Sequence, residues 1–221
     1  MFPIGDDNSG RHATPVVTIA LIAICAFVFF LQLQGGDEFT QTWAFTPARF
    51  TADPIGAAPT LITAMFMHGG WAHFAGNMLY LWIFGDNVED RLGTIPFLIF
   101  YLVCGLAASF AQYAVSPGMN IPNLGASGAI AGVLGAYILM FPKALVRVAI
   151  GYSVVALPAI VVLGFWIALQ LFSGVGSIAT TSSGEETGGV AYMAHVGGFV
   201  AGLALTFLFG GRNTGRPSIG A

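Results

Sequence analysis

Long apolar stretches alternate with short polar segments along almost the whole chain. Six of these stretches approach or exceed the length needed to cross the ~30 Å hydrocarbon core of a bilayer. They cover Pro15–Leu33, Ala72–Phe84, Ile95–Val115, Gly125–Phe141, Val148–Phe172 and Gly189–Phe209. The second is short, and we expect its helix to extend back into Met67–Trp71 and forward to about Asn87. The pattern predicts six transmembrane helices.

The composition supports the same class of protein. Hydrophobic residues make up 56% of the 221 residues and charged residues only 8%, whereas a soluble domain carries roughly 25% charged residues. The 30 glycines fit as well, because small residues let membrane helices pack closely. We therefore predict an all-α membrane protein: one six-helix bundle over residues 15–211, a cytoplasmic N-terminal segment at 1–14 and a cytoplasmic tail at 212–221.

The basic residues predict the orientation of the bundle. If the N-terminus is cytoplasmic, six of the seven Lys and Arg residues fall on the inner side and only Arg49 falls outside. The six are Arg11, Arg91, Lys143, Arg147, Arg212 and Arg216. This is a positive-inside bias, so we expect both termini in the cytoplasm. The first apolar run is too long for a typical signal peptide, and we expect it to be retained.

Neither the cysteines nor the net charge indicates a further function. Cys25 and Cys104 both lie within apolar runs, as expected of free, buried thiols. The formal net charge of −3 is small and spread over the polar segments, so the sequence contains no patch for nucleic acid.

Four polar residues lie at the starts of the second, fourth and sixth predicted helices, which all run from outside to inside. They are His73, Asn77, Ser127 and His195. Ser127 precedes Lys143 by 16 residues, or ~24 Å of helix, which places the serine just below the outer edge of the core. Polar groups at membrane depth are costly, so this shared depth indicates a functional site.

Ser127 is the candidate nucleophile. Pro122 and Gly125 break the chain before it, so Ser127 should lie at a helix N-terminus, where backbone N–H groups and the helix dipole favour negative charge. The alternative is a serine that only caps its helix.

His195 favours the nucleophile over the cap, because the fourth and sixth predicted helices both carry small residues beside the polar group. Ala191, Gly198 and Gly202 flank the histidine, and Ala131 and Gly135 follow the serine, with Gly128 and Gly132 beside them. Such stripes allow close helix approach and would bring the serine oxygen within ~2.6–3.2 Å of the imidazole. A histidine that merely hydrogen-bonds between helices is the alternative.

No acidic residue lies at membrane depth in the last three predicted helices, since Glu185 and Glu186 belong to the preceding loop. We therefore predict a Ser-His dyad rather than a triad. His73 and Asn77 are four residues apart and share one helix face. They would supply donors to an oxyanion, or else hydrogen bonds between helices.

A metal site is the remaining possibility for the histidines. His68, His73 and His195 could in principle hold zinc, with His68 otherwise a structural residue of the preceding loop. The chain has neither an HExxH motif nor a membrane-depth carboxylate near them. We expect no metal and no cofactor.

Three motifs now carry a family resemblance: HFAGN in the second predicted helix, GASG at the start of the fourth and AHVGGFVAG in the sixth. Together they resemble the rhomboid intramembrane serine proteases over Pro15–Gly211. His68, the segment Gly85–Gly93 and the outer loop around Trp43 and Arg49 agree.

The resemblance implies hydrolysis of a peptide bond in or beside a transmembrane helix of another protein, within the lipid bilayer and without metal or cofactor. It makes Ser127 the nucleophile and His195 the general base. His73 and Asn77 would contribute to the oxyanion hole, and Gly125 and Gly128 would shape the turn at the serine.

One position departs from the family. Certain members carry a tyrosine four residues after the serine that stacks on the catalytic histidine, whereas this chain has Ala131. What holds the His195 ring is therefore open. The chain otherwise reads as a minimal six-helix form, suited to a prokaryotic plasma membrane.

We expect a substrate helix to enter between the second and fifth predicted helices. The half-polar approach to the second helix and the loop Ser173–Gly189 would open a cavity towards the outside. Two other functions stay open. One is an inactive relative that binds membrane proteins for quality control, although such proteins lack the serine or the histidine. The other is a small transporter, which would need polar groups nearer the midplane.

Overall fold

A computed structural model describes residues 2–8, 10–181 and 191–208 of the chain. Six long helices form the bundle: α1 Val16–Trp43, α5 Trp71–Leu92, α6 Thr94–Val115, α7 Ser127–Met140, α8 Ala159–Thr181 and α9 Tyr192–Leu208. Four short helices follow α1: α2 Pro47–Ala52, α3 Pro54–Ala57, α4 Thr60–Thr63 and the 3₁₀ helix η1 Ala64–Phe66. Three strands pair antiparallel in the order β1-β2-β3: β1 Phe2–Gly5, β2 Leu145–Ile150 and β3 Ser153–Pro158.

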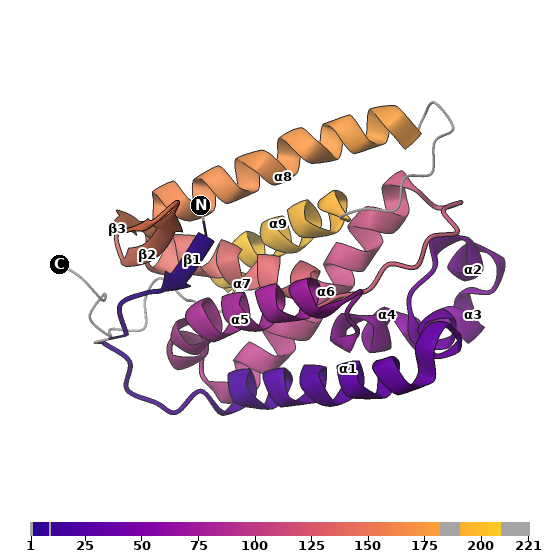
Figure 1. The fold of residues 1–221 in the computed structure, drawn as a ribbon, viewed down its shortest axis with the longest axis horizontal. Helices are drawn as coiled ribbons and strands as arrows, with labels where there is room; N and C mark the ends of the chain where they lie inside the picture. Colours follow the sequence, from indigo (N-terminus) through magenta and orange to yellow (C-terminus); the bar gives the residue numbers. More distant parts are fainter. Residues whose placement is uncertain (1, 9, 182–190, 209–221) are drawn as a thin grey trace.

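The sheet lies at one end of the bundle and the short helices lie at the other (Figure 1). Within the described residues, three helical segments are long and apolar enough to cross a membrane: α1, α6 and Ala159–Gly176 of α8. Helices α7 and α9 are apolar but shorter, and the 14 residues of α7 rise only about 21 Å. The six long helices correspond to the six predicted spans of a helical membrane bundle.

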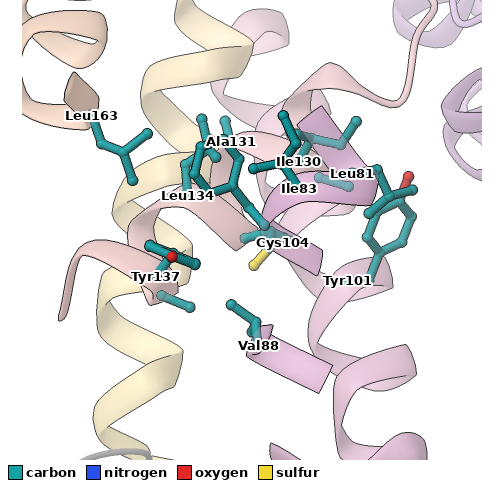
Figure 2. Packing of buried hydrophobic residues seen from close by; sticks show 14 of the residues in the cluster. Leu81, Ile83, Val88, Tyr101, Cys104, Ile130, Ala131, Leu134, Tyr137 and Leu163 are labelled. Atoms are coloured by element: carbon teal, nitrogen blue, oxygen red, sulfur yellow. The ribbon is translucent and has the colours of Figure 1, made fainter. Parts of the chain in front are cut away.

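Helix α7 forms the centre of the bundle, which explains why it can be short. Its residues from Gly128 to Tyr137 are all buried. Ala131, Leu134 and Tyr137 pack among side chains from α5, α6 and α8 (Figure 2). A helix enclosed by its neighbours on every side does not have to match the thickness of the lipid.

Glycines bring α7 and α9 into backbone contact. A Cβ atom on Gly198 would overlap the carbonyl oxygen of Gly128, and one on Gly202 would overlap that of Gly132. A Cβ on Gly135 would likewise overlap the carbonyl oxygen of Phe199. The predicted close approach of the two helices is confirmed, and glycines of the predicted stripes and beside them form these backbone contacts.

The polar end of α5 anchors the start of α1. The Glu89 carboxylate accepts hydrogen bonds from the backbone N–H groups of Val17 and Thr18, both at 2.8 Å, and from the Thr18 hydroxyl at 2.8 Å. The N-terminal residues of a helix need such partners, and Pro15 at the cap position provides no side-chain hydrogen bond. A buried carboxylate from another helix therefore caps α1.

The N-terminal segment is held at the same end. The Asp6 carboxylate accepts hydrogen bonds from Asn87 Nδ2 and the Tyr137 hydroxyl, both at 2.7 Å. Arg11 forms a 2.7 Å ion pair with Asp86. The segment Gly85–Gly93, which agrees with the family pattern in the sequence, thus ties the N-terminal segment and β1 to the bundle.

The fifth predicted span is wrong at its start. Residues from Val148 to Pro158 form the end of β2 and all of β3, and the helix begins only at Ala159. Val146, Val148, Val154 and Val155 favour strands, and Gly151, with φ of 58°, supplies the turn. A continuous apolar run does not separate a strand from a helix.

Two other boundaries also differ from the prediction. Helix α1 continues past Leu33 to Trp43, with non-helical dihedrals at Gly36. Helix α8 continues to Thr181, into the segment expected as the loop Ser173–Gly189. In lipid the backbone groups of a helix have no other partners, so the low helix propensity of the end of α8 does not stop it, whereas α1 is kinked at Gly36. The rest of that loop, residues 182–190, and the tail at 212–221 lie outside the described residues.

Candidate active site

The chain before α7 is fixed by backbone hydrogen bonds. Asn123 and Phe45 exchange two of them, at 2.7 and 3.2 Å, and the Gly125 N–H donates to the Ala64 carbonyl at 2.8 Å. Gly125 has φ of 133°, a conformation that other residues rarely adopt. These contacts deliver the chain to α7 with Ser127 as its first helical residue.

Ser127 does not act as the helix cap. The cap position belongs to Ala126, and no side chain caps this helix end. The Ser127 hydroxyl instead lies 2.8 Å from Nε2 of His195 on α9. The two residues are 68 positions apart in the chain, and the glycine contact between α7 and α9 brings them together.

Two residues of α8 hold the other parts of the His195 ring. Oε1 of Gln170 lies 2.7 Å from His195 Nδ1. The Trp166 ring lies beside the imidazole, with 5.7 Å between the ring centroids and 36° between the planes. Neither residue was predicted from the sequence. The signal was present, because Gln170 is the single amide or charged side chain in the apolar run Ala159–Phe172.

His73 faces the serine turn from α5. Its Nδ1 accepts a hydrogen bond from the Gly69 backbone N–H at 3.2 Å, so Nε2 carries the proton in the neutral ring. The Nε2 edge of the His73 ring lies against Gly125, where an added Cβ would come within 2.8 Å of Nε2. The side chain thus presents an N–H donor next to the start of α7.

Asn77 lies one helical turn further along α5 and is buried, with 9% of its surface exposed. Its Nδ2 makes no hydrogen bond with any described residue. Buried donors normally have partners, so an unpaired amide beside a serine and a histidine is a feature expected of a site that binds a further group.

A cavity of about 230 Å³ joins these residues. Residues of α5 and α8 form two of its walls, and residues of α7 and α9 form the others. Its lining consists of Ala72, His73, Gly76, Asn77, Tyr80, Ser127, Ile130, Leu134, Trp166 and His195. All four predicted polar residues therefore border one cavity.

Gly128, the second predicted turn residue, serves helix packing. A Cβ atom there would lie 2.5 Å from Cβ of Ala108 on α6. Gly128 therefore allows α6 and α9 to approach α7 directly below the serine.

His68 lies at the edge of this site. It is buried, and its ring contacts the rings of Phe29, His73 and Phe74 edge-on. Its backbone N–H donates to Gln32 Oε1 at 3.0 Å. Over the described part of the chain, no three His, Cys, Asp or Glu side chains are grouped so as to hold a metal ion.

Residues 56–212 match the model of the Rhomboid domain. The chain belongs to the rhomboid family. It is 34% identical over 199 residues to the rhomboid protease GluP of Bacillus subtilis, covering 88% of this chain and 36% of that protein. It is 31% identical over 191 residues to the mitochondrial rhomboid protein 1 of Saccharomyces cerevisiae, covering 83% of this chain and 50% of the relative.

A third rhomboid relative is the mitochondrial presenilin-associated rhomboid-like protein of Homo sapiens, which is 37% identical over 99 residues, or 42% of this chain and 26% of the relative. The chain thus spans about a third to a half of the length of the first two relatives. Family membership makes this chain an integral membrane protein with a bundle of the rhomboid type.

Proposed function

We propose that this rhomboid chain is an intramembrane serine endopeptidase that cleaves a peptide bond in or next to the transmembrane helix of another membrane protein. The observation that carries the proposal is the 2.8 Å contact between Ser127 Oγ and His195 Nε2, at the edge of a cavity that the unpaired Asn77 amide also borders. The similarity to the rhomboid protease GluP of Bacillus subtilis supports the same activity.

Four side chains take part in the proposed reaction. His195 Nε2 takes the proton of the Ser127 hydroxyl as its oxygen attacks the substrate carbonyl carbon. The resulting oxyanion is stabilised by three donors: His73 Nε2–H, Asn77 Nδ2–H and the Ser127 backbone N–H. The imidazolium then protonates the leaving amine, the C–N bond breaks, and an acyl-enzyme ester remains. Water, deprotonated by His195, hydrolyses the ester and restores the serine.

The proposed route for the substrate lies between α5 and α8, which form two walls of the cavity. Nucleophilic attack requires extended backbone, so part of the substrate helix has to unwind. Substrates with glycine or other residues of low helix propensity near the cavity should therefore be preferred.

The basic residues support an orientation for the bundle. Arg147 lies in β2 with Lys143 just before it, Arg91 lies in the last turn of α5, and Arg11 pairs with Asp86 of α5, whereas Arg49 lies on α2. The sheet and α2 lie at opposite ends of the bundle (Figure 1). By the positive-inside rule we place the sheet in the cytoplasm and the serine near the outer surface, with both termini cytoplasmic. We propose a prokaryotic plasma membrane as the location.

Cleavage of a model transmembrane substrate by the purified protein in detergent tests the proposal. Ser127→Ala and His195→Ala should each abolish cleavage. Ser153→Ala, which changes a serine in β3 far from the cavity, is the matched control and should cleave at the wild-type rate. Wild-type cleavage by Ser127→Ala would show that the nucleophile is assigned wrongly, and an inactive wild-type protein would favour a binding role.

A further inference from the structure

We propose that Gln170 is a positioning residue that fixes the orientation and tautomer of the His195 ring. This inference rests on the proposed function, because it assigns a third member to the Ser127–His195 pair. It also answers the question that Ala131 leaves open, namely what holds the imidazole when the serine helix supplies no aromatic ring.

The hydrogen bonds of the imidazole set its tautomer. To remove a proton from Ser127, Nε2 has to present its lone pair, which places the single proton of the neutral ring on Nδ1. That N–H needs an acceptor, and Oε1 of Gln170 lies 2.7 Å away. The opposite tautomer would leave Nδ1 facing the amide oxygen with two lone pairs in contact. With its amide oxygen towards the ring, Gln170 therefore favours the form that can act as a base.

Helix α8 contacts the His195 imidazole both at its Nδ1 edge and at its face. Trp166 and Gln170 are four residues apart, so they project from the same side of α8. The indole lies beside the imidazole plane while the amide binds its Nδ1 edge. Ala131 on α7 is buried and adds no ring here. The serine and the histidine thus come from the α7–α9 pair, and the alignment of the histidine comes from α8.

A neutral amide suits this position in a membrane protein. Helices α7, α8 and α9 contain no Asp or Glu within their described residues, and a carboxylate at membrane depth is costly. An amide oxygen accepts the Nδ1 proton without that cost, in the way that an asparagine orients the histidine of papain-like proteases. It stabilises the imidazolium less than an acid would, so its contribution should be smaller than that of a triad aspartate.

Two variants at residue 170 separate positioning from packing. Gln170→Met keeps the length of the side chain but removes the acceptor, and Gln170→Glu keeps an acceptor oxygen. We expect Gln170→Met to lower kcat by about 10- to 100-fold, below the ~10⁴-fold loss for a triad aspartate, with KM unchanged. Gln170→Glu should restore a large part of that loss. Leu171→Met, on the exposed side of the same helix, is the matched control.

Nitrogen NMR of ¹⁵N-histidine-labelled protein supplies a readout that does not depend on cleavage. The His195 signals, assigned by their loss in His195→Ala, should show a protonated Nδ1 in the wild type and a tautomer mixture in Gln170→Met. An unchanged tautomer in Gln170→Met, or equal losses of kcat in both residue 170 variants, would overturn the positioning role. If Ser127→Ala also cleaves normally, the proposed function fails separately, and the NMR result still decides the role of Gln170.

Discussion

The two sides of His195 are packed in different ways. On one side, α9 meets α7 backbone to backbone, with carbonyl oxygens of Gly128 and Gly132 occupying the places where side chains of Gly198 and Gly202 would be. On the other side, α8 meets the histidine through the large side chains of Trp166 and Gln170, next to a cavity of about 230 Å³. Ser127 and His195 thus come from the pair of helices in backbone contact, and the cavity lies on the side where large side chains make the contact.

A glycine-to-alanine change in the α7–α9 contact and one on α8 should have opposite effects on stability and activity. Gly202→Ala puts a Cβ into the Gly132 carbonyl, and overpacking of this kind costs about 1–3 kcal/mol. We expect a lower unfolding temperature in detergent and a large loss of cleavage as Ser127 and His195 separate.

The matched control is Gly164→Ala on α8, where an added Cβ meets no atom within 4 Å. Alanine also favours a helix over glycine by about 1 kcal/mol. This variant should unfold at the wild-type temperature or above and keep full activity. Equal damage from both changes would mean that the two interfaces do not differ in packing.

The cavity side can be tested at Asn77, whose amide donor has no partner among the described residues. Asn77→Ala should lower kcat, because one oxyanion donor is typically worth ~10²–10³-fold and here two others would remain. Its unfolding temperature should change little, since no internal hydrogen bond of Nδ2 is lost. Asn77→Asp, which replaces the donor with an acceptor of the same shape, should lose at least as much activity. Full activity in both variants would remove Asn77 from the proposed oxyanion hole.

A change at Asp6, which binds Tyr137 near the C-terminal end of α7, should affect the site least. Burial raises the pKa of Asp6 from 3.8 to about 7, against the opposing effect of its hydrogen bond from Tyr137. The folded state therefore binds this proton more tightly than the unfolded chain, so its stabilising effect is complete below about pH 4 and is lost as the pH rises through about 7. Proteolysis of the N-terminal segment should become faster over this range.

Asp6→Asn is the control for that pH dependence, because the amide stays neutral at every pH. This variant should show a flatter proteolysis profile, with cleavage of a model substrate close to that of the wild type. If the wild-type segment is held more tightly at pH 8 than at pH 5, the pKa of Asp6 is not raised by folding.

The sequence predicted the parts of the molecule that depend on periodic local signals. Apolar windows located the six long helices, and the glycines around His195 and after Ser127 predicted the close pairing of α7 with α9. The hairpin at residues 145–158 was missed because strands and helices can share a continuous apolar run. The length of α8 was missed because lipid, unlike water, offers exposed backbone groups no partners.

The residues around the cavity were predictable where they lie in motifs, whereas Gln170, which reaches His195 from another helix, was not. Ser127, His195, His73 and Asn77 share a depth that can be counted along the sequence. The contact of Gln170 with His195 depends on the rotation and tilt of α8, which the sequence pattern does not specify. A lone amide in an apolar helix indicates a polar partner, but it does not say which one.

Covalent labelling asks whether Ser127 is an activated nucleophile. The purified protein would be treated with a fluorophosphonate, which reacts with an activated serine, and the modified peptide would be identified by mass spectrometry. We expect a single adduct on Ser127 in the wild type and in Ser153→Ala, and none in His195→Ala. Labelling of Ser127 at the same rate without His195, or no labelling of Ser127 in a folded wild-type protein, would contradict the proposed Ser-His dyad.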